Sequence, residues 1–177
     1  MRNCGQLLNG STFCKMKNCG EFRVVEKSTA DPNNIQEMNL ETDLDQVKKI
    51  WLQGIKETAP PLTSGAPWDS KLDGFIEQIK ITNERYVYEE NGIIKGFITA
   101  GIPTNKNYLS NLYVDSNARG KGIGTKLLDK LRKTYRYLDS HVYERNPYLK
   151  FYQNHGFEVS GEQTCPDTGE IKLRIRW

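Results

Sequence analysis

The sequence predicts a single α/β domain in which strands and amphipathic helices alternate along the chain. Segments with apolar residues at helical spacing alternate with short runs rich in β-branched and aromatic residues. An Asn-Gly turn joins two of these runs, as in a β-hairpin. The chain of 177 residues is also long enough to bury one core without disulfides or metal. The predicted element order from Ile35 to Trp177 is β-α-α-β-β-β-α-β-α-β-β.

The first part of this domain is predicted to hold one strand and two helices. A strand over Ile35–Asn39 precedes a helix that we expect Thr42 to cap and Pro60-Pro61 to end. A second helix is predicted over Trp68–Thr82, after a loop rich in Pro, Ser and Gly. The apolar stripe of the first helix consists of Leu44, Val47, Ile50, Trp51 and Ile55.

The second part is richer in strands. Tyr86–Glu90 and Ile93–Ala100 flank Asn91-Gly92, which is the strongest local signal for a hairpin. Another strand is predicted over Tyr108–Val114, and an amphipathic helix over Gly122–Tyr137. The remaining elements are predicted strands at Leu138–Tyr143, Phe157–Ser160 and Glu170–Trp177, with a short helix after Asn146-Pro147.

The residues before Ile35 show neither helical nor strand periodicity. We therefore expect residues 1–34 to be an extension and residues 35–177 to be the folded domain. The four cysteines form no C-x-x-C pair and the two histidines lie far from the first three of them, so no zinc site is predicted. With no signal sequence and no apolar run of bilayer length, we expect reduced thiols in a cytoplasmic protein.

The charge balance restricts anion binding to a local site. There are 25 basic and 22 acidic residues, a net charge of +3, so composition gives no reason to expect a nucleic-acid or membrane partner. A local site is predicted at Arg119-Gly120-Lys121-Gly122-Ile123-Gly124, between a strand and a helix. Glycines there allow several backbone N–H groups to face one anion, and the helix N-terminus adds partial positive charge. The segment matches neither a P-loop nor the G-x-G-x-x-G dinucleotide pattern.

This loop and its surroundings resemble a known family. Leu112–Asp115, Arg119–Gly124 and Leu127-Leu128 together resemble the acetyl-CoA-binding motif R/Q-x-x-G-x-G/A of the GNAT superfamily of N-acetyltransferases. Downstream, Asn146–Phe157 resembles that family's second signature, N-x-x-A-x-x-F-Y-x-x-x-G-F, with Tyr148 where the family usually has Ala. The resemblance spans roughly residues 35–177 and is strongest to small bacterial cytosolic enzymes.

The resemblance implies a fold and a reaction. The fold would be a mixed, mostly antiparallel sheet of about six or seven strands, with helices on both faces. Two central strands, Tyr108–Val114 and Leu138–Tyr143, would splay apart and admit the pantetheine arm of coenzyme A. Acetyl-CoA would be the cosubstrate, without metal, and a primary amine of a small molecule or peptide would attack it directly in a ternary complex. No nucleic-acid or membrane partner is implied, and a homodimer is compatible with the fold.

The resemblance also assigns site residues. Tyr152 takes the position of the family's general acid, which protonates the departing thiolate. From the residues alone, packing beside Phe157 is the favoured role of Tyr152, and Asn146 serves equally well as an N-cap. The residues that the resemblance assigns to the cofactor are Leu112, Tyr113, Val114, Arg119, Gly120, Lys121, Gly122, Ile123, Gly124, Thr125, Asn146 and Tyr152.

The general base and the acceptor amine stay open at this stage. No acidic residue lies on the strand Tyr108–Leu112, where many relatives carry a glutamate, and Thr58–Trp68 is expected to recognise the acceptor. Two other functions are compatible with the sequence: a non-catalytic acyl-CoA sensor, and a nucleic-acid module that uses the basic helix face. The candidates for the base by residue type are Glu89, Glu90, Asp115, Glu144 and His141. The basic residues of the nucleic-acid alternative are Arg119, Lys121, Lys126, Lys130, Arg132 and Lys133.

Overall fold

The computed structural model describes residues 4–6, 12–14 and 34–177. Within the first two segments, strands β1 (Cys4–Gln6) and β2 (Thr12–Cys14) form an antiparallel pair. The sequence predicted no regular element there, because three-residue strands are too short to show a periodic pattern. Apart from Asn34, the rest of the predicted extension lies outside the described residues.

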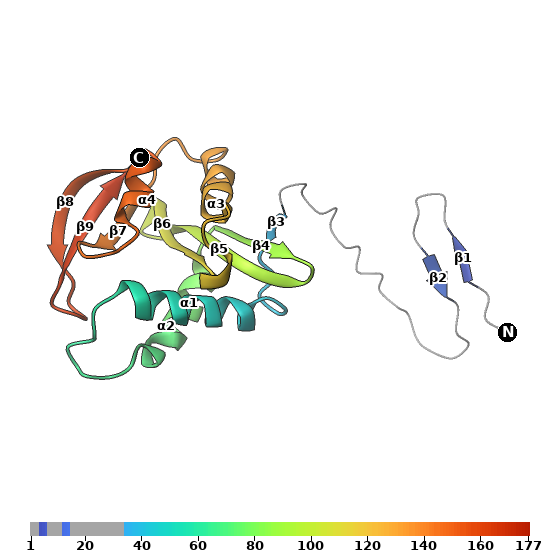
Figure 1. Ribbon diagram of the computed structural model, residues 1–177, viewed down its shortest axis with the longest axis horizontal. Coiled ribbons are helices and arrows are strands. Elements are labelled where there is room, and N and C mark those ends of the chain that lie inside the picture. Colours follow the sequence, from blue (N-terminus) through green and yellow to red (C-terminus); the bar gives the residue numbers. More distant parts are fainter. Residues whose placement is uncertain (1–3, 7–11, 15–33) are drawn as a thin grey trace.

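The main domain is built on a seven-stranded sheet with the strand order β3-β4-β5-β6-β7-β9-β8 (Figure 1). All neighbouring strands are antiparallel except β6 and β7, which are parallel. The expected mixed, mostly antiparallel sheet is therefore confirmed. The strands are β3 (Ile35–Glu37), β4 (Glu84–Glu90), β5 (Ile93–Ile102), β6 (Asn105–Val114), β7 (Asp139–Tyr143), β8 (Glu158–Thr164) and β9 (Ile171–Arg176).

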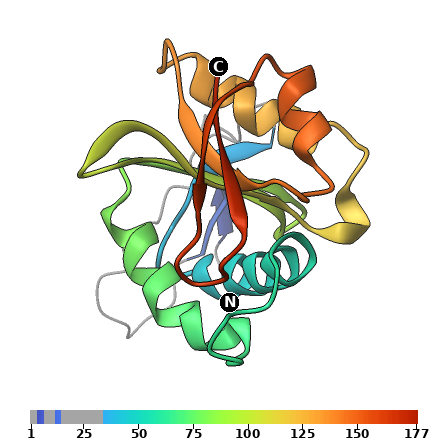
Figure 2. The ribbon, with the colours of Figure 1, turned by 90° about the vertical axis from the view of Figure 1, so that its left-hand side faces the viewer.

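Helices cover both faces of this sheet, as expected. Helices α1 and α2 lie on one face, and α3 and α4 lie on the other (Figures 1 and 2). The order of strands and α-helices from β3 onward matches the predicted order. The helices are α1 (Leu44–Thr58), α2 (Leu72–Ile81), α3 (Ile123–Arg132) and α4 (Leu149–Asn154).

Two hydrophobic cores result from the alternation of side chains along the central strands. On β5, Phe97 packs into the core under α1 and α2, whereas its neighbour Ile98 packs into the core under α3. Both side chains are fully buried. Because successive side chains of a strand point to opposite faces, a helix layer on each face is needed to cover both residues. Burying one such side chain contributes about 1.5–3 kcal/mol.

The hairpin between β4 and β5 has the predicted turn. Asn91 and Gly92 both have positive φ angles, 53° and 78°. Positive φ at both central positions defines the tight turn that matches the twist of a two-stranded hairpin. The register pairs Glu90 with Ile93, so the turn contains only these two residues.

The centre of the sheet is where two strands separate. Within the described residues, β6 and β7 share one register pair, Tyr108 with Asp139. Next to it, the Ser140 hydroxyl donates to the Leu109 carbonyl at 2.9 Å. Beyond this point β6 remains paired with β5 on its other side up to Val114, but β7 pairs with β9. The expected splay of the two strands is therefore confirmed.

The start of α1 differs from the prediction. The helix begins at Leu44 with Asp43 at its N-cap, so the prediction that Thr42 caps it was wrong. The Asp43 carboxylate accepts a hydrogen bond from the Asn39 N–H at 2.9 Å. This bond fixes the turn before the helix instead of capping the first helical turn.

Two other helices are shorter than predicted. Trp68–Lys71 forms a separate 3₁₀ turn before α2, and its Trp68 indole N–H donates to the Pro60 carbonyl at 3.1 Å. Helix α3 ends at Arg132 and not at Tyr137, and the chain tightens after it because the Thr134 N–H donates to the Leu131 carbonyl, three residues back. Tyr135 nevertheless packs against the core, which explains why its position continued the helical pattern.

Candidate active site

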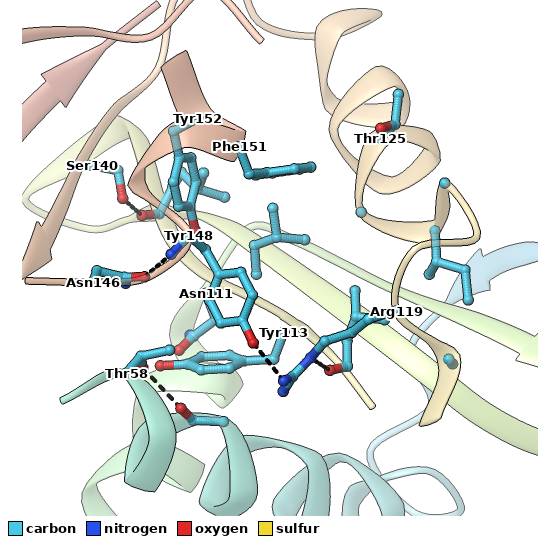
Figure 3. A pocket seen from close by; sticks show the side chains of 18 of the residues that line it. Thr58, Asn111, Tyr113, Arg119, Thr125, Ser140, Asn146, Tyr148, Phe151 and Tyr152 are labelled. Atoms are coloured by element: carbon cyan, nitrogen blue, oxygen red, sulfur yellow. Dashed lines mark hydrogen bonds between the residues drawn. The ribbon is translucent and has the colours of Figure 1, made fainter. Parts of the chain in front are cut away.

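A pocket lies where β6 and β7 separate. Its volume is about 370 Å³. Residues of α1, β6, the loop after β6, the first turn of α3, β7 and α4 form its walls (Figure 3). A second pocket of about 220 Å³ lies between the end of α1, the end of β7 and the start of β9. Thr58, the last residue of α1, lines both pockets.

The glycine-rich loop forms one end of the larger pocket. Gly120 and Gly122 have φ angles of +75° and +77°, and a Cβ atom at either position would meet no other atom within 4 Å. Gly122 is the N-cap of α3, so the N–H groups of the first turn have no partner within the helix. Open space beside these N–H groups and the positive end of the helix dipole suit a phosphate group.

The Arg119 side chain lines the pocket and is held there by residues of other elements. Its Nη1 lies 2.6 Å from Glu57 Oε2 on α1 and donates to the Tyr148 hydroxyl at 2.6 Å. Its Nε donates to the Val114 carbonyl at 3.0 Å. The guanidinium also lies over the Tyr148 ring, 5.1 Å from its centroid. Arg119 therefore connects three elements around the pocket, and Figure 3 shows its contact with Tyr148.

The other predicted cofactor residues share this pocket, with one exception. Lys121 belongs to the loop but does not line the pocket. Thr125 lines it, although its hydroxyl also lies 2.9 Å from His155 Nε2, just after α4. Asn146 lines it too, and its Oδ1 accepts a hydrogen bond from the Tyr148 N–H at 2.8 Å. Asn146 thus holds the turn before α4 while its side chain faces the pocket (Figure 3).

Tyr152 lies where it can both pack against Phe157 and face the pocket, the two positions considered from the sequence. Its ring packs edge-on against Phe157, with centroids 5.5 Å apart, and it also lines the pocket. Burial raises the pKa of Tyr152 to about 12. The phenol is therefore protonated throughout the neutral range, which is the state that a proton donor requires.

Helix α1 supplies a wall of the pocket that the sequence analysis did not find. Gly54 faces the ring of Tyr113, and a Cβ atom there would lie 2.2 Å from Tyr113 Cδ1. Glycine is therefore required for α1 to approach β6 so closely. Burial raises the pKa of Tyr113 well above its usual range. The side chains of Thr58 and Tyr113 lie next to each other in Figure 3.

The pocket offers an unpaired polar atom to a ligand. Ser110 Oγ is buried in the pocket wall, and it has no hydrogen-bond partner among the described residues. A buried hydroxyl without a partner is unfavourable unless a bound molecule supplies one. Together with the open glycine loop, this hydroxyl fits a ligand that has a phosphate at one end and polar groups along its length. The lining residues that sequence reasoning missed include Gly54, Ser110, Asn111, Ser140 and Phe151.

Most candidates for the general base lie away from the pockets. Glu89 accepts hydrogen bonds from Gln36 and Gly92, Glu90 from Tyr88, and Asp115 from the Asn117 N–H. Glu144 alone among the predicted candidates lines a pocket, the smaller one.

His141 also lies outside both pockets. Its Nδ1 lies 3.1 Å from the Tyr108 hydroxyl. Burial, together with Lys172 and Arg174, lowers the pKa of His141. Glu57, which was not predicted, lines the smaller pocket.

Metal-binding clusters and membrane-spanning helices are both missing from the part of the chain that the structure describes. It contains no group of three or more His, Cys, Asp or Glu side chains placed to hold a metal ion. None of its helices has the length and apolar character needed to cross a membrane.

Known proteins share this fold and motif. Residues 82–159 match the family model of the acetyltransferase (GNAT) domain. The peptidyl-lysine N-acetyltransferase YiaC of Escherichia coli is 24% identical over 119 residues, which cover 67% of this chain and 79% of YiaC. An N-acetyltransferase from Staphylococcus aureus is 27% identical, with a TM-score of 0.60 over 81% of this chain and 96% of its own. YncA of Salmonella typhimurium, solved with its cofactor acetyl-CoA, has the same fold at 18% identity (TM-score 0.60; 81% and 91% of the chains).

The splayed sheet, the glycine-rich helix N-terminus and the family match define a transferase that takes an acetyl group from acetyl-CoA. Over residues 82–159 and in its fold, the chain is similar to the GNAT superfamily of N-acetyltransferases. Members of this superfamily act on amines of peptides or small molecules.

Proposed function

We propose that this protein transfers the acetyl group of acetyl-CoA directly to a primary amine while both substrates are bound. The observation that carries the proposal is the pocket between β6 and β7, which joins the glycine-rich loop at one end to Tyr152 and Thr58 at the other. The thioester supplies an activated acetyl group. Backbone N–H groups of the loop and the first turn of α3 hold its diphosphate, and the unpaired edge of β6 holds the pantetheine arm.

Two features of the chain support direct transfer. Thr58 lines both pockets, so a thioester held beside Thr58 in the larger pocket can be attacked by an amine bound in the smaller one, on the side of α1. Tyr152 then donates its phenolic proton to the thiolate as the carbon–sulfur bond breaks. Because burial holds the pKa of Tyr152 near 12, the phenol regains a proton from water after each turnover.

A peptide lysine is the first acceptor to test. YiaC, to which this chain is similar, is a peptidyl-lysine N-acetyltransferase. Thiol release from acetyl-CoA is measured with a lysine-containing peptide, spermidine, an amino sugar and a peptide with a free N-terminus. For an accepted amine, direct attack predicts intersecting double-reciprocal lines when both substrates are varied. Parallel lines would show an acetylated enzyme instead.

We further propose that residues 35–177 are the complete catalytic domain and act in the cytoplasm. The buried free thiol of Cys165 supports a reducing compartment. Deleting residues 1–33 should leave the melting temperature and the affinity for acetyl-CoA nearly unchanged. The first bonds of the sheet are retained in this variant, since the Glu89 N–H donates to the Asn34 carbonyl at 2.9 Å. Thermal denaturation and calorimetry check this, and a large loss of stability would show that the extension is part of the fold.

A further inference from the structure

Glu57 and Arg119 form a direct connection between the two pockets. Among the described residues that line the larger pocket, Arg119 alone carries a charge. Its partner Glu57 lines the smaller pocket. The bond between them, 2.6 Å long, therefore joins the cation of the coenzyme site to a carboxylate of the neighbouring pocket.

The pair is placed to exchange partners. The Arg119 and Glu57 side chains are 27% and 34% exposed, so neither is sealed in the interior. A diphosphate carries more negative charge than one carboxylate, and a guanidinium binds phosphate oxygens through two parallel N–H groups. Since Arg119 begins the loop that would hold the diphosphate, acetyl-CoA competes with Glu57 for the same guanidinium.

We propose that Glu57 is the carboxylate that binds the acceptor amine, and that Arg119 withholds it until acetyl-CoA is bound. The proposal rests on the acetyltransferase function proposed above. When the diphosphate binds the Arg119 guanidinium, the Glu57 carboxylate at the wall of the smaller pocket loses its ion-pair partner. An ammonium group is the complementary partner for it. Glu144 and Glu170 line the same pocket and make its electrostatic potential more negative. Among the described residues, the only cationic side chain in its lining is Arg145.

This arrangement gives the reaction an order. Before acetyl-CoA binds, the Glu57 carboxylate is neutralised by Arg119, and the smaller pocket attracts cations weakly. Afterwards, the amine binds beside Thr58, at the point where the two pockets meet. Glu57 thus acts as a positioning residue for the amine, and its bond to Arg119 makes acceptor binding depend on the coenzyme.

The test compares Glu57→Gln with Asp45→Asn as a matched control. Asp45 lies on the same helix and forms an exposed ion pair of the same length, 2.6 Å, with Lys48. Acetyl-CoA affinity is measured by calorimetry on the full-length protein. Glu57→Gln should bind acetyl-CoA about threefold to fivefold tighter, the range that a partly exposed ion pair supports, because Arg119 is already free. Asp45→Asn should bind it like the wild type.

Acceptor kinetics give the second readout. With saturating acetyl-CoA and the amine that the wild type acetylates fastest, Glu57→Gln should raise the KM for that amine about tenfold while kcat changes little. A merely structural role would lower stability and acetyl-CoA affinity together. Unchanged or weaker acetyl-CoA binding by Glu57→Gln, or an unchanged KM for the amine, would overturn the inference. Absence of transfer by the wild type would instead reject the proposed function and leave the calorimetric result to decide the inference.

Discussion

Replacing Tyr152 with Phe is expected to lower kcat by about 10² to 10⁴, the usual contribution of one general acid. The change removes only the hydroxyl, so the edge-on packing against Phe157 and the affinity for acetyl-CoA should remain almost intact. Steady-state kinetics on an accepted amine, with calorimetry for acetyl-CoA, measure the two effects separately.

The pH dependence adds a second test of the same residue. Because burial raises the pKa of Tyr152 to about 12, the wild-type rate should not decline on the alkaline side until pH approaches that value. Tyr137→Phe is the matched control, since Tyr137 is exposed and lies outside both pockets. If Tyr152→Phe turns over at the wild-type rate, Tyr152 serves packing alone, and Tyr143 and Tyr148 become the candidates for the acid.

The second large effect is expected for Gly122→Val, which should abolish acetyl-CoA binding without unfolding the protein. The position is open in the structure, because a Cβ atom there would have no neighbour within 4 Å, so the new side chain would occupy space that the diphosphate needs. Its φ of +77° also costs a residue other than glycine about 1–2 kcal/mol. Calorimetry with acetyl-CoA and circular dichroism check the two parts.

Gly92→Val is the control that distinguishes the effect of backbone strain in Gly122→Val from the effect of blocking the diphosphate site. Gly92 has nearly the same φ, +78°, and equally open surroundings, but it lies in the β4–β5 turn. Both variants should lose similar stability, and only Gly122→Val should lose the coenzyme. Equal acetyl-CoA affinity in the two variants would place the diphosphate elsewhere. Gly124→Val is a less selective test, since its Cβ would lie 3.1 Å from the Phe151 ring and disturb packing.

The elements of the fold were predictable where one local pattern determines them. The Asn91-Gly92 turn needs positive φ at both residues, and the stripe of α1 needs only helical spacing, so neither depends on distant parts of the chain. Helix ends were less predictable because bonds from outside the helix set them. Asp43 illustrates this, since its carboxylate turns away from the helix to bond Asn39.

In the site, too, features set by a local sequence pattern were predictable, and features set by tertiary contacts were not. The glycine-rich loop could be found because its residue types carry the chemistry of anion binding in one short segment. The wall that α1 supplies could not, because Gly54 and Glu57 have no local signal and meet the site only through tertiary packing. For Arg119 the sequence indicated the charge but not the partners, which come from α1 and from the turn before α4.

Following the acetyl group itself distinguishes acetyl transfer from coenzyme binding alone. Acetyl-CoA with an isotopic label in its acetyl group is incubated with the wild-type protein and each amine of the panel, and mass spectrometry then locates the label. Direct transfer should give labelled N-acetyl amine in an amount equal to the thiol released, with no label on the protein. Acetyl-CoA binding without labelled product from any amine would contradict it and indicate a non-catalytic sensor.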